Sequence, residues 1–329
     1  MSDQGASSNI TPDASTAVRT NPLQFKIEKI LVPLDFSLAS MEALDYAVSM
    51  ARRFRAAIHL VHVYPPDEAS SVPGAGHLLF QSAEAVERIN EELMGIHRKH
   101  APAFRPENCH VRRGRAYEEI VRLAREIDAD LIALSTRGHS GLKHLLLGST
   151  AERVVRSAPC PVLVARKRKQ RSKANREAFA IRTILAPTDF SQCSLAGTEY
   201  AAFLARTLAA KLRFFHAMYP YTNYVFVDRA GVRLSGLAEA MEETARQEMD
   251  ALKQMDFLRG LSVQTEILPG HAVDEICAAA GERGVDLIVT STHGRTGLKH
   301  ALIGSVAEHV VRYAQCPVLV VPSRCRPDS

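Results

Sequence analysis

The sequence contains no tryptophan, and aromatic residues make up only 6% of its 329 residues. No apolar run reaches the roughly 18 to 20 residues that a membrane span requires. The N-terminus lacks a basic segment followed by an apolar one, so we predict no signal peptide. Hydrophobic residues account for 46% and charged residues for 23%, as in ordinary globular proteins. We therefore expect a cytoplasmic protein with no membrane partner.

The six cysteines form neither a C-x-x-C pair nor a Cys/His spacing typical of a metal site. Cys160 and Cys316 each stand directly before a Pro-Val-Leu-Val segment. Cysteines in such apolar surroundings usually act as small buried side chains rather than as reactive thiols. A reducing compartment agrees with this use, and the sequence predicts no metal site.

Recognisable catalytic motifs are also missing. There is no Gly-x-x-x-x-Gly-Lys-Ser/Thr loop and no second acidic motif with a clear magnesium role. No Ser/His/Asp or Cys/His set can be assembled by spacing. His144 and His300 occur at equivalent places in two similar segments, but recurrent loop histidines are more often structural than catalytic. These absences favour a binding module over an efficient enzyme.

What the chain does contain is an internal duplication. Residues 287–322 match residues 131–166 without a gap, and 23 of these 36 residues are identical. Apolar strand-like segments alternate with helical patterns in both halves, which predicts βαβ units and parallel sheets. We expect two tandem α/β domains, at 26–166 and 181–322, each with one five-stranded parallel sheet flanked by helices. The expected strands are 26–33, 57–64, 108–113, 130–134 and 161–165, and then 182–186, 212–217, 262–268, 286–290 and 317–321. The expected helices are 40–53, 81–100, 116–127 and 150–157, and then 194–210, 237–258, 273–283 and 306–313.

The segments outside these domains are polar. Residues 1–25 form an N-terminal tail that we predict to be disordered, and residues 323–329 form a short C-terminal tail. Residues 167–180 form a linker, most of which belongs to a basic run over 166–176. A solvated linker and a weak contact with nucleic acid or an acidic partner both stay open for this run. The net charge of +5 gives the folded parts no specific nucleic-acid signature.

A glycine-containing loop follows the fourth strand of each half. Gly138 is separated by nine residues from Gly148-Ser149, and Gly294 by nine residues from Gly304-Ser305. A helical pattern begins directly after each loop, and a helix N-terminus offers unpaired N–H groups to an anion. This arrangement favours a phosphate site. Alternatively, Ser149 and Ser305 only begin capping boxes, since glutamate follows each serine three residues later.

Two motifs, each present twice and in the same order, carry a family resemblance. One is the glycine loop, and the other is Pro-x-Asp-Phe-Ser after the first strand, at 33–37 and 187–191. Together they resemble universal stress proteins, whose loop pattern is Gly, two residues, Gly, nine residues, Gly-Ser/Thr. The chain departs from that pattern at the first glycine of both loops, where it has Ser135 and Ser291. The resemblance covers nearly all of residues 26–322.

The resemblance implies a tandem member with Rossmann-like domains of the adenine nucleotide alpha hydrolase type that binds ATP, with or without Mg²⁺. Its function would be that of a nucleotide-dependent stress-response or regulatory module. A slow ATP hydrolase, or an assembly module without nucleotide, are the alternatives. The residues that would contact the nucleotide are Asp35, Val63, Ser135, Gly138, Gly148 and Ser149 in the first domain, and Asp189, Ala217, Ser291, Gly294, Gly304 and Ser305 in the second.

Several assignments stay open at this point. An aspartate at a strand end, such as Asp35 or Asp189, accepts from a ribose hydroxyl or caps the next helix. Lys143 and Lys299 neutralise phosphate or are simply exposed. The apolar final strands would be exposed sheet edges unless they pair. We therefore predict that they pair with each other within the chain, and a homodimer is a further possibility.

Overall fold

The computed structural model describes residues 25–65, 83–101, 103, 105–135, 148–166, 181–219, 237–294 and 304–323. Strands and α-helices alternate through both halves, so the predicted α/β class is confirmed. The first half contains β1 (Lys29–Pro33), α1 (Leu38–Phe54), β2 (Ala57–Tyr64), α2 (Ala83–His100), β3 (Cys109–Arg113), α3 (Ala116–Glu126), β4 (Leu131–Ser135), α4 (Ser149–Ser157) and β5 (Val162–Ala165). The second contains β6 (Thr183–Pro187), α5 (Gln192–Leu208), β7 (Lys211–Met218), α6 (Leu237–Lys253), β8 (Val263–Pro269), α7 (Ala272–Glu282), β9 (Leu287–Ser291), α8 (Ser305–Tyr313) and β10 (Val318–Val321).

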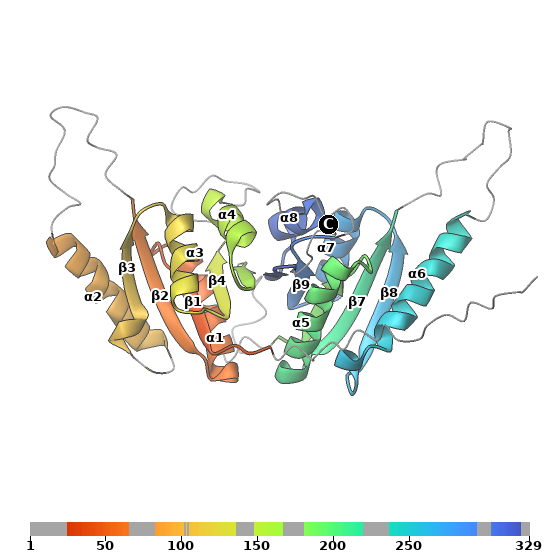
Figure 1. Ribbon diagram of the computed structural model, residues 1–329, viewed down its shortest axis with the longest axis horizontal. Coiled ribbons are helices and arrows are strands. Elements are labelled where there is room, and N and C mark those ends of the chain that lie inside the picture. The colour runs from red at the N-terminus through yellow and green to blue at the C-terminus, as the bar shows by residue number, and fades with distance from the viewer. Residues whose placement is uncertain are drawn as a thin grey trace, which may run out of the picture.

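The strands form one continuous sheet in the order β3-β2-β1-β4-β5-β10-β9-β6-β7-β8 (Figure 1). Within each half all strand pairs are parallel, as predicted. The halves meet where β10 pairs antiparallel with β5, with Leu319 opposite Leu163. The two sheets are therefore joined rather than separate. The pairing gives hydrogen-bond partners to two short apolar strands that would otherwise be exposed edges.

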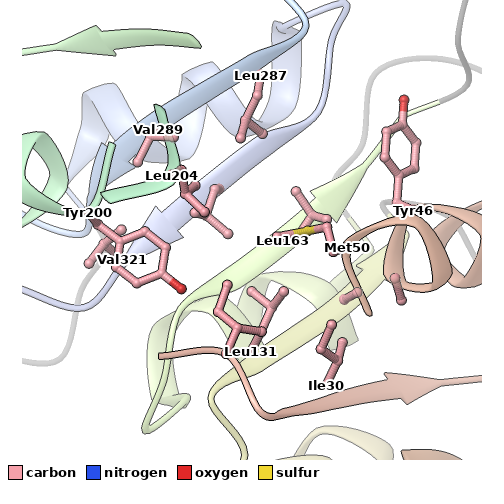
Figure 2. Packing of buried hydrophobic residues seen from close by; sticks show 14 of the residues in the cluster. Ile30, Tyr46, Met50, Leu131, Leu163, Tyr200, Leu204, Leu287, Val289 and Val321 are labelled. Atoms are coloured by element: carbon pink, nitrogen blue, oxygen red, sulfur yellow. The ribbon is translucent and has the colours of Figure 1, made fainter. Parts of the chain in front are cut away.

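Two layers of helices cover the sheet, and each layer has its own hydrophobic core. Helices α1, α2, α5 and α6 pack on one core, while α3, α4, α7 and α8 pack on the other. Each core contains buried residues from both halves. Figure 2 shows this continuity at the junction, where Leu163 and Met50 of the first half face Leu204 and Val321 of the second. The duplicated units thus share their interior.

Polar contacts also cross the junction. The Arg166 guanidinium donates to the backbone carbonyls of Val311 and Arg312, at the C-terminal end of α8. Arg53, near the end of α1, donates to the Thr207 carbonyl over 2.8 and 3.0 Å. These arginines complement the negative ends of helices that belong to the other half.

Tyr200 of α5 carries a buried hydroxyl at the junction for which the described residues provide no hydrogen-bond partner. Burial raises the pKa of this phenol. An unpaired buried hydroxyl costs desolvation energy, so we expect Tyr200→Phe to raise the free energy of unfolding by about 1 kcal/mol. Urea denaturation followed by circular dichroism measures the change.

Tyr46 of α1 occupies the position that corresponds to Tyr200 of α5, and it provides the matched control for the Tyr200→Phe variant (Figure 2). Its hydroxyl donates to the Arg166 carbonyl at 3.5 Å. Tyr46→Phe should therefore leave stability unchanged or lower it by up to about 1 kcal/mol. A destabilised Tyr200→Phe variant would show that this hydroxyl is satisfied in solution.

His59 of β2 and His110 of β3 form a stacked pair, with His59 Nδ1 and His110 Nε2 3.2 Å apart. Burial, and then the neighbouring His110, lower the pKa of His59 from 6.5 to about 4. Burial lowers the pKa of His110 as well. Between about pH 4 and 6.5 the unfolded chain therefore binds more protons than the folded protein. The two histidines therefore contribute fully to the free energy of unfolding above about pH 6.5. This contribution should be lost as the pH falls from about 6.5 to about 4.

Comparing the melting temperature at about pH 7.5 with that at about pH 5 tests this expectation. His59→Gln removes the titrating group and should reduce the pH dependence. Arg213→Gln, at the equivalent position of β7, is the matched control and should leave it intact. An identical pH dependence in His59→Gln would contradict the assignment.

Two details differ from the sequence predictions. The helix expected over 237–258 ends at Lys253, and a 3₁₀ turn, Asp256–Leu258, follows after Met255 takes an extended conformation. The cysteines also behave differently from one another. Burial raises the pKa of Cys160 and of Cys316 to about 12, as expected of inert thiols. Cys193, however, is disulfide-bonded.

Among the described residues, no helix is both long enough and apolar enough to cross a bilayer. The N-terminal tail to residue 24 and the linker 167–180 lie outside the described part of the chain, as do residues 324–329.

Candidate functional site

Each half contains a pocket beyond the carboxyl ends of its strands, where α/β sheets commonly bind ligands. The first pocket has a volume of about 200 Å³ and the second about 280 Å³. In each, the walls are the turn after the first strand, the end of the second strand, and the junction between the fourth strand and its helix. The pockets therefore have the same construction in both halves.

The residues that the sequence singled out come together in these pockets. The first pocket is lined by Asp35, Val63, Ser135, Gly148 and Ser149. The second is lined by Asp189, Ala217, Ser291, Gly294, Gly304 and Ser305. Gly138, Lys143 and Lys299 lie outside the described residues, so their predicted roles stay predictions.

The Asp-Phe-Ser turn shapes one wall of each pocket. Phe36 and Phe190 have φ values of 61° and 63°, a left-handed conformation that is uncommon for a bulky side chain. This turn brings Asp35 Oδ1 to 2.6 Å from the Ser37 hydroxyl and 3.0 Å from the Ser37 N–H, both of which donate to it. Asp189 accepts from Ser191 in the same way. Strain of this kind is often found where a functional side chain must be aimed.

The same geometry settles which residue caps the following helix. Ser37 is the N-cap of α1, and its hydroxyl accepts from the Ser40 N–H at 3.2 Å. Ser191 caps α5 equivalently, accepting from Ser194 at 3.1 Å. Asp35 therefore orients the capping serine without capping the helix itself. Its position on the pocket wall is compatible with the other role considered, contact with a ligand hydroxyl.

The opposite wall is the N-terminus of α4 in the first half and of α8 in the second. The N-cap residues are Gly148 and Gly304, and neither helix has a side-chain cap. The alternative that Ser149 and Ser305 begin capping boxes is therefore wrong. The glutamates of those motifs instead pair along the helix, as Glu152 does with Arg156 at 2.8 Å. The first-turn residues of both helices line the pockets, so the helix ends that carry unpaired backbone N–H groups border them.

The surroundings of Gly304 and Gly294 indicate close packing rather than unusual dihedral angles as the reason for a glycine. Gly148 and Gly304 have φ values of −60° and −57°, which any residue adopts. A Cβ on Gly304 would lie 3.3 Å from the Thr292 carbonyl oxygen. A Cβ on Gly294 would lie 2.4 Å from Oδ2 of Asp189, which shows how closely the two pocket walls approach.

A pair of histidines supports the site, and the sequence reading missed them. His62 Nδ1 lies 2.8 Å from the Leu34 carbonyl, and the ring stacks on Phe36 at 4.7 Å. His216 makes the same contacts with Thr188 and Phe190. The histidines thus hold the strained Asp-Phe-Ser turn in place. Their recurrence one residue before Val63 and Ala217 was the available signal.

The two pockets differ in polarity. The first is lined by Leu34, whereas the second has Thr188 at the equivalent position. The Thr188 hydroxyl accepts from the Phe190 N–H at 3.0 Å and lies 3.2 Å from the Ser194 hydroxyl. The second pocket also includes His293, whose Nδ1 lies 2.8 Å from the Ser323 hydroxyl. Among the described lining residues, the second pocket therefore adds the Thr188 hydroxyl and the His293 ring, and its volume is the larger of the two.

No group of three or more His, Cys, Asp or Glu side chains that could hold a metal ion occurs among the described residues.

Comparison with known proteins agrees with the duplicated architecture. The model of the universal stress protein family matches residues 26–166 and again residues 180–322. A universal stress protein of Methanocaldococcus jannaschii is 36% identical over 142 residues, which are 42% of this chain and 80% of that protein. The crystal structure of a universal stress protein from Archaeoglobus fulgidus DSM 4304 covers 89% of this chain and 98% of its own, with a TM-score of 0.60 and 20% identity.

A further solved structure is a universal stress protein in complex with cAMP, which is 25% identical and covers 44% of this chain and 98% of its own, with a TM-score of 0.30. Both halves are matched by the family model, and both carry the motif residues in their pockets. The chain therefore belongs to the universal stress protein family, as a tandem member with two family domains.

Proposed function

We propose that each pocket binds ATP and that the protein is a nucleotide-dependent regulatory module of the stress response. The observation that carries this proposal is the construction of the pockets. A strand-end aspartate, the end of the second strand and an uncapped helix N-terminus face one another in each of them. A nucleotide needs these three kinds of contact, for its ribose, its base and its phosphates.

Within this proposal, each part of the nucleotide has a place. The phosphates accept from first-turn N–H groups of α4 or α8, whose positive dipole ends favour anions. Asp35 and Asp189 accept from ribose hydroxyls. The backbone at Val63 and Ala217 contacts adenine. Mg²⁺, if it accompanies ATP, is held mainly by phosphate oxygens and water, in keeping with the lack of an acidic cluster in the described part.

The first test is mass analysis of the small molecules released when the purified protein is denatured. Calorimetric titration of ligand-free protein with ATP follows, with and without Mg²⁺, and with cAMP as a second ligand. We expect two ATP molecules per chain, and tighter binding by one site because the pockets differ. ADP release over hours separates a binding module from a slow hydrolase. An ATP-free preparation that binds no ATP would favour the assembly module.

A further inference from the structure

The second pocket carries a tyrosine at its rim. Phe215 and Ala217 of β7 both line this pocket. Alternate residues of a strand point to the same face, so Tyr219 continues their row just beyond the end of β7 at Met218. The Tyr219 side chain is 51% exposed, and among the large apolar side chains in the described part of the chain only Leu38 is more exposed. A large aromatic surface therefore faces solvent just outside the second pocket.

Neighbouring contacts place this ring at the start of α7. The backbone next to it is still held to the sheet, because the Gly270 N–H donates to the Met218 carbonyl at 2.8 Å. The rings of Tyr219 and His271 meet edge to face, with their centroids 5.7 Å apart and their planes at 90°. His271 is the N-cap of α7, and the next residue, Ala272, lines the pocket. The ring therefore stands between the end of β7 and the start of α7.

The first half shows that the duplicated fold does not require this ring. The equivalent row there is Val61, Val63 and Pro65, and the two valines line the first pocket. The position equivalent to His271 is Arg115, the N-cap of α3. Neither Pro65 nor Arg115 is aromatic, so the first pocket has no aromatic pair at this place. The pair distinguishes the second pocket from the first.

We propose that Tyr219 stacks against the base of a nucleotide in the second pocket, and that this contact gives the second site a higher affinity for ATP than the first. The inference rests on the proposed function, in which the backbone at Ala217 contacts adenine. Tyr219 follows Ala217 on the same face, about 7 Å further along the strand direction, so a base at the end of β7 lies beside its ring. Stacking uses the aromatic face that every base has. The contact therefore selects ligands that carry a base over phosphates alone.

Calorimetric titration of the full chain with ATP and with inorganic tripolyphosphate tests the stacking. Tyr219→Ala should weaken ATP binding at the second site about tenfold, the usual scale for losing a contact between a base and an aromatic ring. Tripolyphosphate has no base, so it should bind Tyr219→Ala as well as it binds the wild type. The first site should keep its affinity for ATP. Tyr219→Phe should bind ATP like the wild type, because stacking uses the ring and not the hydroxyl.

The possible failures can be told apart. Unchanged ATP affinity in Tyr219→Ala would overturn the stacking and leave the proposed function standing. Equal losses for ATP and tripolyphosphate would also overturn it, since they indicate a distorted pocket rather than a lost base contact. A Tyr219→Phe variant as weak as Tyr219→Ala would assign the effect to the hydroxyl and so contradict stacking. A wild-type second pocket that binds no ATP would overturn the proposed function and this inference together.

The absence of tryptophan from the chain provides an optical test. Tyr219→Trp places a single indole at the rim, and adenine stacked on it should quench its fluorescence as ATP is added. Tripolyphosphate should leave the fluorescence unchanged. Tyr313→Trp is the matched control, because Tyr313 is 43% exposed and lies at the end of α8 opposite the turn that lines the pocket. Its fluorescence should not respond to ATP. A Tyr219→Trp protein that binds ATP by calorimetry without a change in fluorescence would overturn the proposal.

Discussion

Valine at both Gly148 and Gly304 should abolish ATP binding while the fold persists. Both glycines have φ values that valine adopts, so the backbone does not forbid the change. The added side chain, however, enters the space where a phosphate would meet the first-turn N–H groups. Losing two or more charge-assisted hydrogen bonds corresponds to about 3 kcal/mol or more, which is at least a hundredfold in affinity. Calorimetric titration with ATP measures this loss.

The single variants make the test sharper. Gly148→Val should lose the first site and Gly304→Val the second, so that each keeps one ATP per chain. Gly281→Val changes a glycine of α7 around which the structure leaves open space, and it controls for a general effect of valine. Circular dichroism must show that all variants are folded. A folded double variant with unchanged ATP affinity would remove the phosphate role from these helix ends.

Alanine at Leu163 and at Leu319 should each lower the free energy of unfolding by about 2 to 5 kcal/mol. These leucines are paired in register across the junction, and their exposed fractions are 1% and 0%. Because they belong to one core that spans both halves, the double variant should deviate from additivity by about 0.5 to 3 kcal/mol. Urea denaturation should be followed by far-ultraviolet circular dichroism, since the chain has no tryptophan.

The natural control is Leu38→Ala. Leu38 is 87% exposed, so its truncation should change stability by less than about 0.5 kcal/mol. The wild-type protein should unfold in one transition because its halves share both core layers. Two separate transitions, or a loss below about 1 kcal/mol in the double variant, would show that the junction contributes little to stability.

Much of the candidate site could be predicted because its residues lie at the ends of periodic segments. Asp35 lies two residues after β1, and Gly148 directly precedes α4. The apolar patterns of these elements are clear, and parallel strands bring their carboxyl ends together. Ser149 was harder to assign, since a Ser-x-x-Glu pattern does not distinguish the N-cap from the first helical residue. The structure gives the cap to Gly148 and pairs Glu152 with Arg156.

The remaining features depend on contacts between distant segments, which single-sequence patterns do not report. His62 acts by reaching the Leu34 carbonyl from a neighbouring strand. The Tyr200 hydroxyl is buried without a hydrogen-bond partner among the described residues, and Phe25 of the other half packs against its ring. Cys193 is disulfide-bonded, but it stands in no recognisable sequence motif, so the sequence alone does not separate it from the free cysteines.

Helix α8 has a different task at each of its two ends. Its first turn lines the second pocket, and its last carbonyls accept from Arg166, which directly follows β5 of the first half. An anion at the first turn and a guanidinium at the last turn both stabilise the same helix dipole. If phosphate binds at the first turn as proposed, the two contacts are thermodynamically linked. A bound phosphate would then strengthen the contact between Arg166 and α8 by some free energy. The Arg166 contact would strengthen phosphate binding by the same free energy.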